Sequence, residues 1–191
     1  MPLPLGHAAI GWTTHALISR KQPSLRNWRQ VIFITLLANL ADIDIIVGLL
    51  LYGNGSALHR GPTHSLLFAL LAGLLASNVW RLGRLFPRVD FVICFLSILS
   101  HVLADFFLTS APISFCWPLE VNWSIGYTGW ADIFNSVLFD SFQDAGIIIG
   151  CGVVLIFSNL LKRNRVFPTI GAQPQLERGS GTDRLATQRT P

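Results

Sequence analysis

Ionisable side chains are concentrated in the apolar stretches of this chain. Its first 105 residues hold every histidine and three aspartates that interrupt apolar runs: His7, His15, His59, His64, His101, Asp42, Asp44 and Asp105. A charged group within a membrane segment costs several kcal/mol and persists mainly where it has a partner or a function. Imidazoles and carboxylates are also ligands of divalent metal ions. These residues are therefore the first candidates for a functional site.

Two local spacings suit metal ligation. His101 and Asp105 are four residues apart in SHVLAD. On a helix they share one face about 6 Å apart, within reach of one ion or of two neighbouring ions. His59 and His64 lie on either side of Gly61-Pro62 in HRGPTHS. The proline excludes a continuous helix, and such a turn can direct both imidazoles to one point.

Other candidates leave alternatives open. Asp42 and Asp44 in LADIDI are two residues apart and would lie on different helix faces, so either the helix opens there or only one of them is a ligand. Arg60 could form a salt bridge with an acid or bind an anionic substrate oxygen. His7 begins the first apolar segment and is a candidate ligand. We expect His15, two turns deeper, to be an interfacial histidine outside the site.

The composition places the chain in a lipid bilayer. Apolar residues make up 51% of the chain and charged residues only 13%, with a mean hydropathy of +0.52. Roughly a quarter of the residues are charged in ordinary soluble domains. These values exclude a disordered scaffold, a collagen-like or disulfide-rich secreted fold and a soluble nucleic-acid binder. The expected partner is the lipid bilayer, and no nucleic-acid partner is expected.

The apolar runs predict an all-α, polytopic membrane protein, a helical bundle of four to five transmembrane segments. Crossing ~30 Å of hydrocarbon at 1.5 Å per residue takes about 20 apolar residues. The four main runs and a weaker fifth run are 31–52, 65–80, 91–108, 145–161 and 5–18. Residues 1–166 are predicted to form one membrane-embedded domain. The polar, aperiodic residues 167–191 are predicted to be a disordered tail.

The cations predict an orientation. Every cation except Arg60 lies in residues 20–29, in residues 81–88 or after Leu161, and this last group gives the net charge of +4. The positive-inside rule makes these segments, including the C-terminal tail, cytoplasmic. The candidate ligands then share one layer at the outer ends of their segments. Five to seven such groups at one depth would be costly without an ion to offset their desolvation.

Five motifs, in this order and with this spacing, resemble the bacterial family of LexA-regulated inner-membrane metal-dependent hydrolases. They are Gly6-His7, LADIDI, HRGPTHS, SHVLAD and APISFCWP, and they cover residues 6–118. The chain departs from the family pattern at Ala41, where the family commonly has proline. It also departs at Thr109, which follows Asp105 by four residues instead of three. The resemblance implies a multi-pass protein of the bacterial inner membrane that is a hydrolase using a divalent metal.

The residues and the resemblance together predict a metal-dependent hydrolase with its site at the outer membrane–water interface. A phosphoester or a lipid-linked bond is the expected substrate. The candidate metal ligands are His7, Asp42, Asp44, His59, His64, His101 and Asp105, and the candidate catalytic residues are Asp42, Asp44 and Arg60. One aspartate would orient or deprotonate a water molecule, and Arg60 would hold an anionic group. This donor set favours Zn²⁺, bound as one or two ions.

Two other classes of protein remain as alternatives. A small ion-coupled transporter or channel could use Asp42, Asp44 and Asp105 as a relay. A relay should be spread through the membrane depth, whereas these residues are predicted to lie near one face. A non-catalytic membrane adaptor could instead recruit partners through its tail.

Overall fold

The computed structural model describes residues 3–19, 26–109, 111–119, 121–124 and 144–165. These residues form helices connected by turns, with an isolated antiparallel bridge between Ile113 and Trp123. The predicted all-α class is confirmed. The predicted tail, residues 167–191, lies outside the described residues.

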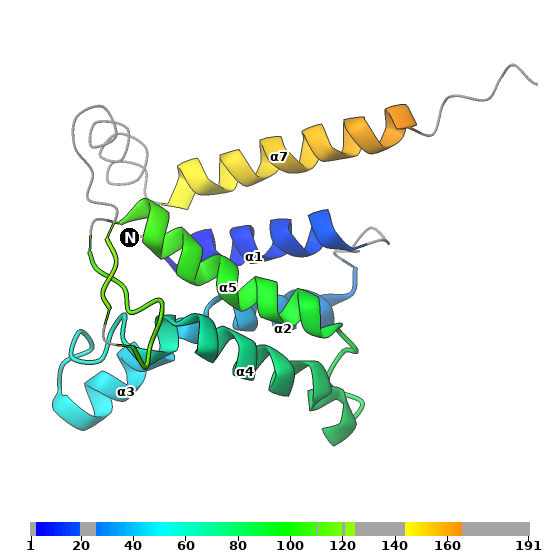
Figure 1. Ribbon diagram of the computed structural model, residues 1–191. Helices are drawn as coiled ribbons and strands as arrows, with labels where there is room; N and C mark the ends of the chain where they lie inside the picture. Colours follow the sequence, from blue (N-terminus) through cyan, green and yellow to red (C-terminus); the bar gives the residue numbers. More distant parts are fainter. Residues whose placement is uncertain (1–2, 20–25, 110, 120, 125–143, 166–191) are drawn as a thin grey trace, which may run out of the picture.

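Every predicted apolar run contains helix (Figure 1). The elements are α1 (Pro4–Ile18), α2 (Trp28–Ala38), η1 (Leu40–Asp42), α3 (Ile43–Tyr52), η2 (Pro62–His64), α4 (Leu66–Asn78), η3 (Val79–Leu82), α5 (Phe91–Leu108) and α7 (Asp144–Arg165), where η is a 3-10 helix. Local signals fix several ends. The Ser65 hydroxyl caps α4 by accepting the Phe68 N–H at 3.1 Å, and Gly53 ends α3 in the left-handed conformation, with a φ of 66°.

Two of these helices have the length and apolarity needed to cross a bilayer. They are α5 and the segment Asp144–Lys162 of α7. Helices α2 and η1–α3 together have this length and apolarity but are bent by 55°, which gives up to three spans among the described residues. The apolar segment Leu66–Leu82 is shorter, and α1 has 15 residues. The predicted membrane bundle is thus confirmed, and two to three of its four to five segments have spanning length.

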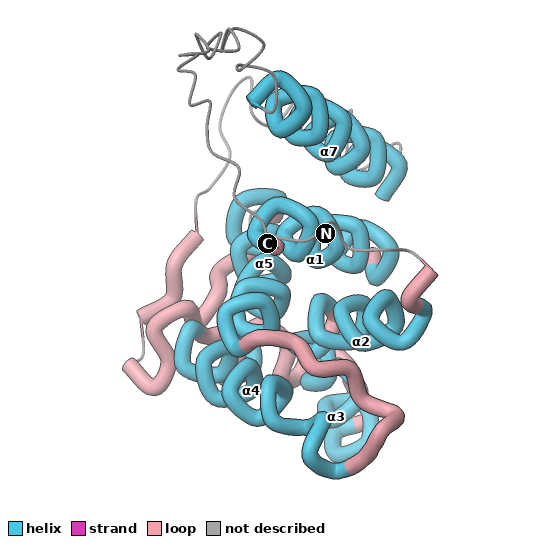
Figure 2. Tube along the Cα trace, turned by 90° about the vertical axis from the view of Figure 1, so that its right-hand side faces the viewer, coloured by secondary structure: helices cyan, strands magenta, loops and turns pink. Residues whose placement is uncertain are grey.

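Helices α1 and α5 lie at the centre of the bundle (Figure 2). Helix α1 packs against α2, α5 and α7, and α5 also packs against α2 and α4. Glycines permit two of these close approaches. A Cβ at Gly73 of α4 would lie 2.8 Å from the Phe95 Cα of α5, and one at Gly11 of α1 would lie 2.5 Å from the Ala38 Cβ of α2. Small residues at helix contacts are typical of membrane bundles.

The outer surface of the bundle is apolar. Large aliphatic and aromatic side chains are exposed on every α helix, such as Leu75 of α4 and Ile149 of α7. Only 11% of the apolar window of α7 is buried inside the protein. Such broad apolar exposure is unsuited to water and fits contact with lipid.

The two ends of the bundle differ in the side chains that they carry, and one of them is basic. Helices α1, α4 and α7 end, and α2 and α5 begin, at the right-hand side of Figure 1. Here Arg29 Nη1 donates to the Arg84 carbonyl at 3.0 Å, and Lys162 Nζ donates to the Ala16 carbonyl at 3.4 Å. The start of α1, the break between α2 and α3, and the end of α5 lie at the other side. That end carries the candidate ligands.

Candidate metal centre

All seven candidate ligands come together at this end of the bundle, although they come from five parts of the chain. They are His7 in the first turn of α1, Asp42 at the end of η1, Asp44 in α3, His59 and His64 before and at the end of η2, and His101 and Asp105 in α5. His7, Asp44, His64, His101 and Asp105 are buried, with at most 3% of each exposed.

A break in the α2–α3 segment brings both Asp42 and Asp44 to the site. Helix α2 ends at Ala38, and the Asn39 side chain donates to the carbonyl of Thr35 at 2.9 Å. The single 3-10 turn of η1 then redirects the chain by 55°. The helix therefore opens here without a proline, which was one of the two alternatives that the sequence allowed.

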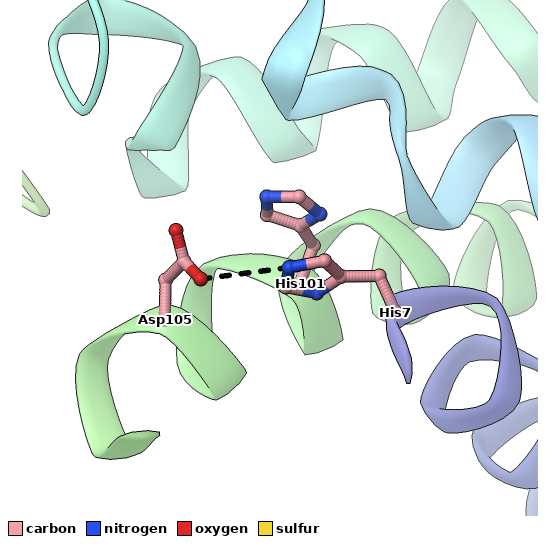
Figure 3. A group of neighbouring side chains, drawn as sticks. All are labelled: His7, His101 and Asp105. Atoms are coloured by element: carbon pink, nitrogen blue, oxygen red, sulfur yellow. Dashed lines mark ion pairs between the residues drawn. The ribbon is translucent and has the colours of Figure 1, made fainter. Parts of the chain in front are cut away.

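The centre of the cluster consists of carboxylates facing histidine Nε2 atoms. Asp42 Oδ1 lies 3.3 Å from His101 Nε2 and 3.6 Å from His64 Nε2. Asp105 lies between two other rings, with Oδ2 3.5 Å from His64 Nε2 and Oδ1 3.5 Å from His7 Nε2. The rings of His7 and His101 stack at 3.7 Å between centroids, which joins α1 to α5 (Figure 3).

Hydrogen bonds outside this centre orient three of the histidines. His101 Nδ1 lies 2.7 Å from the Ala38 carbonyl. Asp44 Oδ1 lies 3.2 Å from His59 Nδ1, and its Oδ2 lies 3.1 Å from His64 Nδ1. Carbonyls and carboxylates only accept, so each of these Nδ1 atoms carries the proton. The Nε2 of each ring is then free to bind a metal, which is the usual arrangement of metal-binding histidines.

Asp44 is itself held by the turn that contains the histidines. Its Oδ2 accepts a hydrogen bond from the Thr63 hydroxyl at 2.6 Å and one from the Arg60 backbone N–H at 3.2 Å. With the His59 imidazole N–H on Oδ1, both of its oxygens accept hydrogen bonds. Asp44 therefore connects α3 to the HRGPTHS turn.

Several buried polar atoms of the cluster have no hydrogen-bond partner. They are His7 Nδ1 and Nε2, Asp42 Oδ1, the Nε2 atoms of His59, His64 and His101, and both oxygens of Asp105. Three sets of ligand atoms lie within 4.8 Å of one another: His7, His101 and Asp105; Asp42, His64 and His101; and Asp44, His59 and His64. Unpaired buried polar atoms are rare in folded proteins. A nitrogen and oxygen donor set of this kind fits a divalent metal ion.

The electrostatics of the cluster favour a cation. Burial lowers the pKa of His64, which lies outside the spanning segments, but its contacts with the carboxylates of Asp105, Asp42 and Asp44 outweigh burial and raise this pKa to about 10. Three carboxylates around one imidazole thus stabilise positive charge at its position.

Arg60 lies at the edge of the cluster in an uncommon backbone conformation. Its φ is 67°, in the left-handed region that non-glycine residues seldom adopt. The Arg60 N–H bonds to Asp44 and its carbonyl accepts the Ser114 N–H at 3.2 Å, so both neighbours fix this conformation. The side chain places Nε 3.8 Å from Asp105 Oδ2. Its guanidinium is therefore a partly buried positive group beside the candidate ligands.

Some contributors to the site were missed in the sequence. The Thr63 hydroxyl could have been suspected because it lies within HRGPTHS, whereas the Ala38 carbonyl carries no sequence signal. Asp144 hydrogen-bonds the first turn of α1, and its distance along the chain hides this contact. His15 lies outside the cluster, as expected, and it is buried, with its Nε2 3.1 Å from Gln30 Nε2.

The fold and the site define a helical membrane protein with a buried histidine–aspartate cluster near one end of its bundle. The chain belongs to the YdjM inner membrane protein family, whose family model matches residues 1–166. This membership supports the inner-membrane location. No curated protein and no solved structure matches the chain.

Proposed function

We propose that this protein is a membrane-bound, metal-dependent hydrolase. The supporting observation is the set of buried nitrogens and carboxylate oxygens that face one another without hydrogen-bond partners. A divalent ion would satisfy these atoms together, whereas a purely structural cluster would leave their desolvation uncompensated. The hydrogen bonds on the outer nitrogens of His59, His64 and His101 support the same proposal.

The proposed ligands fall into a central set and a peripheral set. Asp42, His64 and His101 would hold one ion, because Asp42 Oδ1 lies within 3.6 Å of the Nε2 atoms of both histidines. His7 and Asp105 would complete this site or hold a second ion. Zn²⁺ is the metal that the donor set favours, and when bound it would acidify water and polarise a phosphoryl or carbonyl oxygen.

We assign different roles to the two aspartates of LADIDI. Both oxygens of Asp44 already accept hydrogen bonds, so it would orient His59 and His64 rather than ligate. The Asp42 side chain is 17% exposed, against 3% for Asp44 and 0% for Asp105. Water therefore reaches Asp42 most easily, and this carboxylate would accept the proton of the attacking water.

The substrate would be an anionic phosphoester or a lipid-linked bond. Arg60 has its buried Nε unpaired by hydrogen bonds and is suited to hold an anionic oxygen. An apolar cavity of about 340 Å³ flanks the end of α5, and it is lined by Leu103, Phe106, Phe107, Phe115, Cys116 and Trp123. Such a cavity beside a charged site suits an amphiphile, with its hydrocarbon chain in the cavity.

Metal analysis of the detergent-purified full-length protein tests the proposal. We expect about one to two zinc ions per wild-type chain and a loss of most of this metal in the His64→Ala, His101→Ala double variant. His15→Ala, which removes a buried histidine outside the cluster, is the matched control and should retain the metal. The metal-loaded wild type is then assayed on phosphoesters and lipid-linked phosphates.

Two results would contradict the hydrolase proposal. The first is wild-type protein without bound metal, or with metal unchanged in the double variant. The second is ion flux in liposomes that is lost in Asp42→Asn, which would favour the relay alternative. The grouping of Asp42, Asp44 and Asp105 around His64 supports a site more than a relay, since a relay needs groups spaced through the membrane.

A further inference from the structure

The first residue of α7 caps the first turn of α1. Asp144 Oδ1 accepts the Leu3 N–H at 2.6 Å, and Asp144 Oδ2 accepts the Gly6 N–H at 2.8 Å. The N-cap residue of α1, Leu3, makes no side-chain cap of its own. A buried carboxylate that accepts two N–H groups at a helix start forms charge-assisted hydrogen bonds and is favoured by the helix dipole. Asp144 therefore fixes the position of this turn.

Gly6 is required for this contact. A Cβ at Gly6 would lie 2.6 Å from Asp144 Oδ1 and 3.1 Å from Ile147 Cδ1. Any larger side chain would push α7 away and separate the carboxylate from the N–H groups it accepts. The Gly-His pair of the sequence thus combines a residue that admits Asp144 with the candidate ligand that follows it.

His7 lacks the orienting hydrogen bond that the other histidines have. Both of its ring nitrogens are buried without a hydrogen-bond partner, whereas His101 is held by the Ala38 carbonyl and His64 by Asp44. The place of the His7 ring beside Asp105 and His101 consequently depends on where the backbone of α1 begins. Asp144 holds that backbone at the residue directly before His7.

We propose that Asp144 is a positioning residue that holds His7 in the metal centre. Helix α7 thereby takes part in assembling the site, although it contributes no candidate ligand among the described residues. The role of His7 as a ligand rests on the proposed function, whereas its placement by Asp144 can be tested without metal.

Chemical modification tests the placement in metal-free, full-length protein. Diethylpyrocarbonate modifies accessible imidazoles, and the extent at each histidine is read by peptide mass spectrometry. His7 and His15 are both buried on α1 and should be protected in the wild type. In Asp144→Ala, His7 should become modified at least several-fold more, while His15 stays protected. Asp90→Ala, which removes an exposed acid that makes no cap hydrogen bond, should leave both protected.

Unchanged protection of His7 in Asp144→Ala would overturn the proposal. An equal rise at His7 and His15 would overturn it as well, because it would mean general loss of the fold. Asp144→Asn, which keeps the shape but loses the charge, provides a milder variant and should raise modification of His7 less than Asp144→Ala does.

A double-mutant cycle on Zn²⁺ affinity tests the consequence for the metal centre. Asp144→Asn should weaken Zn²⁺ binding about 10-fold, the size typical for residues that orient ligands. The same substitution should have little effect in a His7→Ala background, because it acts through His7. If the losses of Zn²⁺ affinity from Asp144→Asn and His7→Ala were additive in the double variant, the positioning role of Asp144 would be overturned. A wild type that binds no Zn²⁺ would refute the proposed function, and the modification experiment would still decide the role of Asp144.

Discussion

At the residue scale, the hydrogen bonds behind the histidines decide what the site can bind. His101 and His64 each give their Nδ1 proton to an acceptor outside the centre, the Ala38 carbonyl and Asp44. Their Nε2 atoms consequently face the carboxylates of Asp42 and Asp105. Carboxylates on several sides of these rings stabilise a positive charge at this position. The orienting groups are therefore as informative about the function as the candidate ligands.

Thr63 provides a test at this scale. Thr63→Val removes the hydroxyl that donates to Asp44 at 2.6 Å while keeping the side-chain shape. Asp44 should then hold His64 less firmly, and Zn²⁺ affinity measured by calorimetry should fall about 10-fold. Thr109→Val is the control, because the Thr109 hydroxyl donates within its own helix end, to the Asp105 carbonyl at 2.7 Å. Equal effects of the two substitutions would contradict the role of Thr63.

The sequence was informative about this site where spacing alone decides geometry. The four-residue spacing of His101 and Asp105 placed both on one helix face, and both do face the cluster from α5. The two-residue spacing of Asp42 and Asp44 left two outcomes, because a helix break without proline has no clear signature. Every residue has a backbone carbonyl, so the sequence does not mark the Ala38 carbonyl as an acceptor. Only the packing of α2 against α5 reveals it.

At the element scale, the lengths of the apolar runs predicted where helices form better than they predicted which helices can span the membrane. Each apolar run contains helix, because a backbone in lipid must satisfy its own hydrogen bonds. The run 31–52 divides into α2, η1 and α3, since Asn39 and Asp42 interrupt the helical hydrogen bonding between two apolar halves. The contact between α4 and α5 in turn depends on one glycine.

Gly73 is expected to be intolerant of a single added methyl group. A Cβ there would meet the Phe95 backbone at 2.8–2.9 Å, and backbone cannot move aside as a side chain can. Gly73→Ala should lower the free energy of unfolding by about 1–3 kcal/mol, measured by thermal or denaturant unfolding in detergent. Gly150→Ala is the matched control, because a Cβ on that helical glycine of α7 meets nothing within 4 Å. There the helix propensity of alanine should leave stability unchanged or slightly raised.

At the scale of the whole molecule, the basic segments and the histidine–aspartate cluster lie at opposite ends of the bundle. The basic segments meet where Arg29 bonds to the Arg84 carbonyl and Lys162 bonds to the Ala16 carbonyl. The candidate ligands lie at the other end, where α1 begins and α5 ends. The sequence predicted this separation from the positions of its charged residues. Lysines and arginines in loops gather on the cytoplasmic side of the membrane, whereas acids within spans do not follow this rule. An orientation of the bundle therefore also fixes which compartment the site faces.

The orientation is the last prediction, and it decides where the substrate comes from. The positive-inside rule places the basic end in the cytoplasm and the cluster at the outer interface. Alkaline phosphatase fused after Thr109, at the cluster end of α5, should therefore be active, and fused after residue 166 it should be inactive. Green fluorescent protein at the same two positions should give the opposite pattern, which controls for expression. The reverse result would place Asp42 and Arg60 on the cytoplasmic side, and a hydrolase there would act on substrates of the inner leaflet or the cytoplasm.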